Sequence, residues 1–135
     1  MATGKQITFV DASVLINAAV GPNAARRMRA LAVLGDPNRE FVATQFLVLE
    51  VIPVPTKFKK TKELAFYQRF FQGVTTWIDE AALIQPAIDL ACKHGLGGMD
   101  ALHLAAAVGA NAELISAEKP TKPIYGAYSN VSSVY

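Results

Sequence analysis

The chain has 135 residues, of which 52% are hydrophobic and 18% charged, and its formal net charge is +2. This length suits a single domain over residues 1–135, and this composition excludes an intrinsically disordered chain. No apolar run reaches the ~18 residues that a membrane span requires, and the N-terminus lacks an uninterrupted signal-peptide core. We therefore expect a soluble, cytoplasmic protein with no membrane partner. A single cysteine, Cys92, excludes an internal disulfide and a thiolate zinc cage, and we expect it to be a buried, inert thiol.

The first half of the chain alternates short apolar runs with helical patterns. Two short strands are expected, one containing Ile7, Phe9 and Val10 and one from Glu40 to Ala43. Three helices are expected, from about Ser13 to Ala19, from the Asn23 cap to about Leu34, and from the Thr44 cap until Pro53 and Pro55 end it.

The second half continues the alternation. Helices are expected from about Lys62 to Gln72, from Pro86 to about Lys93, and from Met99 to Val108. Strands are expected within Val74–Ile78, at Leu114–Ser116 and at Ile124–Tyr125. Because strands alternate with helices, the sequence predicts an α/β fold with a mostly parallel sheet of four or five strands flanked by helices.

Four acidic residues occur where such a fold places ligands. Asp11 follows the first strand, Glu50 lies in the otherwise apolar helix FLVLEVI, Asp100 opens the helix after a glycine turn, and Glu118 follows the strand Leu114–Ser116. The carboxyl ends of parallel strands share one edge of the sheet. We therefore expect these four acids to converge.

Each acid also has a purely structural interpretation. Asp11 or Ser13 caps the next helix, Asp100 interacts with a helix dipole, and Glu118 beside Lys119 is a solvated turn residue. Glu50 is different, because a buried carboxylate on an apolar helix face requires a partner or a metal. The joint placement of all four favours a site over four coincidences.

A carboxylate cluster without a thiolate suits hard cations, Mg²⁺ or Mn²⁺. Because like charges repel, the cluster would destabilise the fold without a bound metal. With metal bound, it can activate a water and steady the leaving oxygen of a phosphodiester. If the four acids bind metal, 13 basic residues face seven remaining acids, and this balance favours a polyanionic partner.

The same residues carry a family resemblance. The chain resembles the PIN domain, the metal-dependent nuclease fold that includes VapC-like toxins, in four stretches: VDASVLI, FLVLEV, MDALHLAAA and LISAEK. The resemblance implies a four- or five-stranded parallel sheet with helices on both faces. It also implies that Asp11, Glu50 and Asp100 are core acids that coordinate Mg²⁺ or Mn²⁺ for RNA hydrolysis. The resemblance thus implies a ribonuclease that acts as the toxin of a toxin–antitoxin pair, with an antitoxin protein as partner.

The fourth position departs from the family pattern. Family members usually carry Thr-x-Asp after the fourth strand, whereas this chain has Ser116-Ala117-Glu118. Ser116 can supply the same hydroxyl, with Ser13 as a second supporting hydroxyl, and Glu118 carries the same charge on a longer arm. This departure supports an alternative function, a catalytically weak or inactive PIN-like module that binds RNA or a protein. A phosphotransfer receiver domain also clusters acids at strand ends, but its phosphorylated Asp lies on a central strand and not on the first.

Three further features have two interpretations each. His103 lies one turn after Asp100 and either lines the site or packs beside the sheet with a satisfied ring nitrogen. The lysines of KFKKTK form either a solvated face or an RNA-steering surface. The helix Lys62–Gln72 carries four aromatic residues, more than one face buries, which indicates a homodimer or partner interface.

Overall fold

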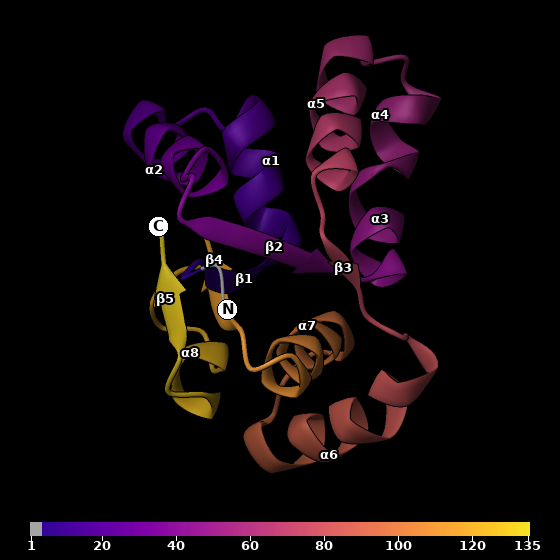
Figure 1. Ribbon diagram of the computed structural model, residues 1–135, viewed down its shortest axis with the longest axis vertical. Helices are drawn as coiled ribbons and strands as arrows, with labels where there is room; N and C mark the ends of the chain where they lie inside the picture. Colours follow the sequence, from indigo (N-terminus) through magenta and orange to yellow (C-terminus); the bar gives the residue numbers. More distant parts are fainter. Residues whose placement is uncertain (1–3) are drawn as a thin grey trace.

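A five-stranded, all-parallel sheet forms the centre of the computed structural model, which describes residues 4–135 (Figure 1). Residues 1–3 of the predicted domain lie outside this description. The strands are β1 (Gln6–Val10), β2 (Arg39–Ala43), β3 (Thr76–Trp77), β4 (Glu113–Ser116) and β5 (Val131–Ser133), in the spatial order β3-β2-β1-β4-β5. The predicted α/β class with a parallel sheet is confirmed.

Helices cover both faces of the sheet. One face carries α1 (Ala12–Val20), α2 (Ala24–Leu34), α3 (Gln45–Val51), the short α4 (Pro53–Lys57) and α5 (Thr61–Gln72) (Figure 1). The other carries α6 (Ile84–His94), which a 3₁₀ turn at Ala81–Leu83 precedes, together with α7 (Gly98–Gly109) and α8 (Ile124–Ala127).

The alternation of side chains along β1 explains why both faces need cover. Val10 points into the core with α1, α2, α3 and α5, whereas its neighbour Phe9 points into the core with α6, α7 and α8. Both side chains are fully buried. Covering both faces of a parallel strand buries its side chains on both sides, and the second half of β1, Thr8–Val10, is buried in this way.

Two helix caps predicted from the sequence are confirmed. The Asn23 side chain accepts a hydrogen bond from the Arg26 backbone N–H at 2.8 Å, and the Thr44 side chain accepts one from Leu47 at 3.3 Å. The expectation that the helix capped by Thr44 ends at the prolines is confirmed at Pro53, because α3 ends at Val51; a separate short helix, α4, then begins at Pro53 and contains Pro55. Proline is tolerated in the first turn, where its missing N–H would have no helical partner.

Two sequence predictions are wrong. Ile124 and Tyr125 lie in α8 and not in a strand; the fifth strand is β5, which pairs with β4. Pro123 fixes a helical start, and Ile124 packs beneath the sheet. Cys92 is exposed on α6, because that helix packs inward through the stripe containing Ala87, and Cys92 lies around the other side.

The aromatic residues of α5 are mostly accommodated within the chain. Tyr67 is fully buried, and Phe66, Phe70 and Phe71 are half-buried against the same core. The Phe70 ring lies 5.5 Å from that of Phe41 in an edge-to-face arrangement. They therefore leave less free apolar surface than the sequence pattern indicated, and the homodimer stays a prediction.

A cluster of ion pairs and hydrogen bonds lies at the amino ends of the strands. Arg39 pairs with Asp36 and Glu113, each at 2.8 Å, and Thr8 donates to the same Glu113 carboxylate at 2.7 Å. These contacts tie β1, β2 and β4 together at the edge opposite Asp11. Within residues 4–135, every helix is too short or too polar to cross a bilayer.

Candidate functional site

A cavity of about 170 Å³ opens at the carboxyl edge of the sheet. Its lining residues are Asp11, Ala12, Ser13, Ile16, Glu50, Asp100, His103 and Glu118. The edge lies beside the β1–β4 pair, where the topology reverses: β2 and β3 lie on one side of β1, and β4 and β5 on the other. Open α/β sheets bind ligands at such a switch point. The structure thus brings all four acids of the sequence prediction to one cavity, called here the acid cavity.

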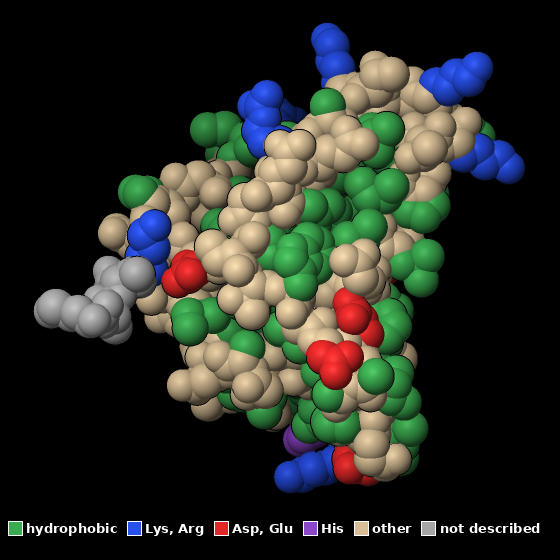
Figure 2. Space-filling view, turned by 45° about the vertical axis from the view of Figure 1, so that its right-hand side comes forward, with side chains coloured by type: hydrophobic (Ala, Val, Ile, Leu, Met, Phe, Trp, Pro, Cys, Tyr) green, Lys and Arg blue, Asp and Glu red, His purple; other side chains and the backbone are tan. Residues whose placement is uncertain are grey.

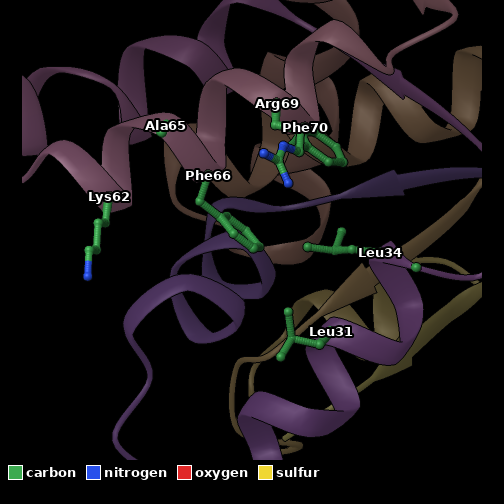
Figure 3. Close-up of a pocket in the computed structure, with 8 residues that line it drawn as sticks. Leu31, Leu34, Lys62, Ala65, Phe66, Arg69 and Phe70 are labelled. Atoms are coloured by element: carbon green, nitrogen blue, oxygen red, sulfur yellow. The ribbon is translucent and has the colours of Figure 1, made fainter.

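Larger hollows lie elsewhere on the surface. One of about 480 Å³ separates α2 from α5 (Figure 3), and another of about 560 Å³ lies between the start of α6 and the end of α7. Both are mainly apolar and neither contains an acid cluster. Because several acidic side chains line only the smallest of these three cavities, its chemistry and not its size identifies it as the candidate site.

Asp11 occupies the junction between β1 and α1. It follows Val10 directly, and its carboxylate caps α1 by accepting the Val14 N–H at 3.4 Å. The Ser13 hydroxyl donates a second, short hydrogen bond to the same oxygen. The capping interpretation is therefore correct, and the same carboxylate also lines the cavity.

Burial dominates the electrostatics of Asp11, which is only 4% exposed. Desolvation raises the pKa of its carboxyl above the ordinary 3.8, while the hydroxyls of Ser116 and Ser13 and the charge of His103 partly offset that rise. An anion held in such a place gains from a nearby cation.

Two serines link the strand ends that flank the cavity. The Ser13 hydroxyl accepts the Ala117 N–H at 2.8 Å and lies 3.4 Å from the Ser116 hydroxyl. Ser116 in turn accepts the Glu118 N–H at 3.0 Å. Ser13 lines the cavity, whereas Ser116 acts on the backbone behind it, so the two hydroxyls fix the position of Glu118 relative to Asp11.

Glu118 lies in a segment whose backbone is anchored. Its carbonyl accepts hydrogen bonds from the Tyr125 hydroxyl at 2.6 Å and the Ser133 hydroxyl at 3.4 Å. Its side chain is half-buried and lines the acid cavity. This placement favours a site residue over a solvated turn residue.

Glu50 and His103 come from helices that pack against opposite faces of the sheet. Glu50 lies in the last turn of α3, and one of its carboxylate oxygens contacts Nε2 of His103 on α7. His103 is 2% exposed and lies against Phe9, with ring centroids 5.3 Å apart. Both interpretations of His103 therefore hold in part, since it packs beside the sheet and also lines the site. Its Nδ1, however, has no hydrogen-bond partner within the described residues.

Asp100 stands in the first turn of α7, one turn before His103. A carboxylate at a helix N-terminus interacts favourably with the helix dipole. The side chain is half-buried and faces the same cavity as Asp11 and Glu50. As with Asp11, a local structural role and a place in the cavity coexist.

The donor set fits a hard divalent cation. Four carboxylates around one cavity are the oxygen ligands that Mg²⁺ and Mn²⁺ prefer. As positioned here, no three His, Cys, Asp or Glu side chains between residues 4 and 135 lie close enough together to hold an ion. The Asp11 carboxylate is hydrogen-bonded to Ser13, and the Glu50 carboxylate is hydrogen-bonded to His103.

The sequence comparison decides the family. Residues 8–120 match the PIN domain. This chain belongs to the PIN-domain family. The match contains Asp11, Glu50, Asp100 and Glu118. No curated protein matches the chain significantly.

Solved structures share this PIN fold across nearly their whole length. A toxin–antitoxin complex from Klebsiella pneumoniae is 20% identical, with a TM-score of 0.70 over 95% of this chain and 98% of that chain. VapBC2 from Rickettsia felis, bound to a promoter DNA fragment, is 16% identical with a TM-score of 0.68 over the same shares. FitAcB from Neisseria gonorrhoeae is 16% identical, with a TM-score of 0.56 over 93% and 95%. At these identities the likeness establishes the fold.

Proposed function

We propose that this PIN domain is a divalent-metal-dependent endoribonuclease that hydrolyses RNA phosphodiesters. The single observation that carries the proposal is the convergence of Asp11, Glu50, Asp100 and Glu118 on one cavity at the switch point of the sheet. Repulsion among four carboxylates destabilises the folded protein, so a purely structural role does not explain the cluster. A bound cation neutralises the repulsion and makes the cluster favourable.

The four carboxylates would hold Mg²⁺ or Mn²⁺, which lowers the pKa of a bound water and neutralises charge on the scissile phosphate. Asp11 is the most deeply buried of them, and its two local hydrogen bonds fix its orientation. The Ser13 hydroxyl accepts a hydrogen bond from the Ala117 N–H and so links the start of α1 to the segment after β4. This link fixes the Asp11 side of the cavity relative to the Glu118 side. Ile16 contributes an apolar side chain to the lining of the cavity.

Basic residues at the α4–α5 end support RNA as the substrate. Lys and Arg side chains gather at this end of the molecule (Figure 2). Lys57, Lys59, Lys60 and Lys62 are all exposed. Val20, at the end of α1, lines a shallow hollow with Lys60 and Lys62, and Ile16, one turn earlier on the same helix, lines the acid cavity. An exposed ridge of α1, formed by Ile16 and Val20, thus runs between the lysines and the acids, and an RNA strand lying along it would bring its phosphates to the lysines at one end.

We also propose that this chain is the toxin of a toxin–antitoxin pair. The structure from Klebsiella pneumoniae that shares this fold is a toxin–antitoxin complex. The α2–α5 groove suits an antitoxin segment with apolar and acidic residues (Figure 3). Its apolar lining comes from Leu31, Leu34, Ala65, Phe66 and Phe70, and its basic residues are Lys62 and Arg69.

The test is cleavage of a labelled single-stranded RNA in Mn²⁺ by wild type, Asp11→Asn and Asp100→Asn. Both variants should lose cleavage while remaining folded, because each loses a charged ligand without losing volume. Asp89→Asn is the matched control, since Asp89 is an exposed acid on α6 that pairs with Gln85. Wild-type cleavage by either cavity variant would remove that residue from the proposed centre.

Two observations favour the alternative, a PIN-like module that binds RNA or protein without cleaving. The carboxylates do not converge on an ion as positioned here, and Glu118 stands where the family usually has Asp. Measured Mn²⁺ affinity separates the two functions. A catalytic domain binds Mn²⁺ through the acid cavity, whereas an inactive module has no such requirement.

A further inference from the structure

His103 has an unusual set of contacts for a buried histidine. It is 2% exposed, one ring face lies against Phe9, and Nε2 contacts the Glu50 carboxylate. Nδ1 is buried without a hydrogen-bond partner among the described residues. A buried polar atom without a partner costs stability. A residue that served only to fill this space would be better apolar, so the contact with Glu50 requires an explanation.

The Glu50 side chain must be held in one rotamer if it is to act as a metal ligand. It is 29% exposed and projects from the final turn of α3, next to the helix break at Pro53. A free glutamate there would sample many rotamers, and most would point to solvent. Within residues 4–135, the only hydrogen bond that the structure shows for the Glu50 side chain is with His103. That contact leaves its second oxygen without a protein ligand.

We propose that His103 is a positioning residue: its Nε2–H holds one oxygen of Glu50 so that the other is aimed into the acid cavity to receive a divalent cation. The inference rests on the proposed function, because it concerns the same metal site. Groups that hydrogen-bond to a metal ligand fix its orientation, and losing such a group typically weakens metal affinity ~10- to 100-fold.

The two ring nitrogens of His103 can be replaced separately, because Nε2 contacts Glu50 and Nδ1 does not. A glutamine side chain places its amide nitrogen where Nε2 lies, whereas an asparagine places its amide nitrogen where Nδ1 lies. His103→Gln therefore keeps a donor towards Glu50, and His103→Asn does not. His103→Leu removes both nitrogens while keeping an apolar side chain beside Phe9, which preserves the fold if the asparagine variant fails to fold. All three changes lose the ring contact with Phe9.

The experiment is calorimetric titration of Mn²⁺ into metal-free wild type and the three variants, with melting temperature measured on the same samples. The expected result is wild-type affinity for His103→Gln and a ~10- to 100-fold loss for His103→Asn and His103→Leu. A purely structural role would instead lower the melting temperature of all three and leave their Mn²⁺ affinities equal.

Three results would overturn the inference. Equal affinity in all four proteins would make His103 a core residue only. Tighter binding in His103→Asn and His103→Leu would mean that His103 competes with the cation for Glu50. Absence of Mn²⁺ binding by wild type would remove the proposed function and this inference together, whereas the first two results leave the proposed function standing.

Discussion

Mn²⁺ should raise the melting temperature of this protein substantially. The native state holds four carboxylates around one cavity, and the unfolded chain has no such arrangement. A cation that binds only the native state, at 100 times its dissociation constant, adds ~2.7 kcal/mol to the free energy of unfolding. Unfolding entropy is ~2.1 cal/mol/K per residue, or ~0.28 kcal/mol/K for a chain of this length. The expected rise is therefore ~10 °C.

Asp100→Asn should remove most of that rise. The substitution keeps the volume and the first-turn position in α7 but replaces an anionic ligand with a neutral one. If affinity falls ~100-fold, the same Mn²⁺ concentration contributes only ~0.4 kcal/mol, which corresponds to ~1–2 °C. Asp89→Asn changes a comparable acid outside the cavity and should keep the full rise.

The assay is a thermal melt followed by circular dichroism across a Mn²⁺ titration, with metal-free protein as the baseline for each variant. An unchanged wild-type melting temperature at millimolar Mn²⁺ would refute the metal site. A full rise in Asp100→Asn would leave a metal site but exclude Asp100 from it.

Two other outcomes follow from the cavity. Asp11→Asn should stabilise the metal-free protein at neutral pH, because the folded-state pKa of Asp11 is raised and its buried charge destabilises the fold above that pKa. The gain should shrink as pH falls and vanish below the ordinary pKa of 3.8, where both states are protonated; a gain independent of pH in urea melts would exclude this cause. For Glu118, cleavage should hold or rise in Glu118→Asp and fall less in Glu118→Ala than in Asp11→Asn, since water can replace one ligand. Superimposable curves of rate against Mn²⁺ concentration would remove Glu118 from the centre.

Local sequence signals determined most of the elements. The apolar run of β1, the caps at Asn23 and Thr44, and the glycine turn before α7 each act within a few residues, so periodicity and capping rules apply directly. The predicted position of Asp11 after a strand followed from the same local signals. The misassigned segment Ile124–Tyr125 is short, and in such a segment packing and not propensity decides between helix and strand.

Only the tertiary structure decided how the acids are held. The link from Ser13 to Ala117 joins positions 104 residues apart and exists because β4 pairs with β1. The contact between Glu50 and His103 joins helices that cover opposite faces of the sheet and meet at its carboxyl edge. No local pattern encodes either contact, since each depends on strand order. The sequence alone determined which residues were available, and the pairing of distant strands and helices determined which of them support one another.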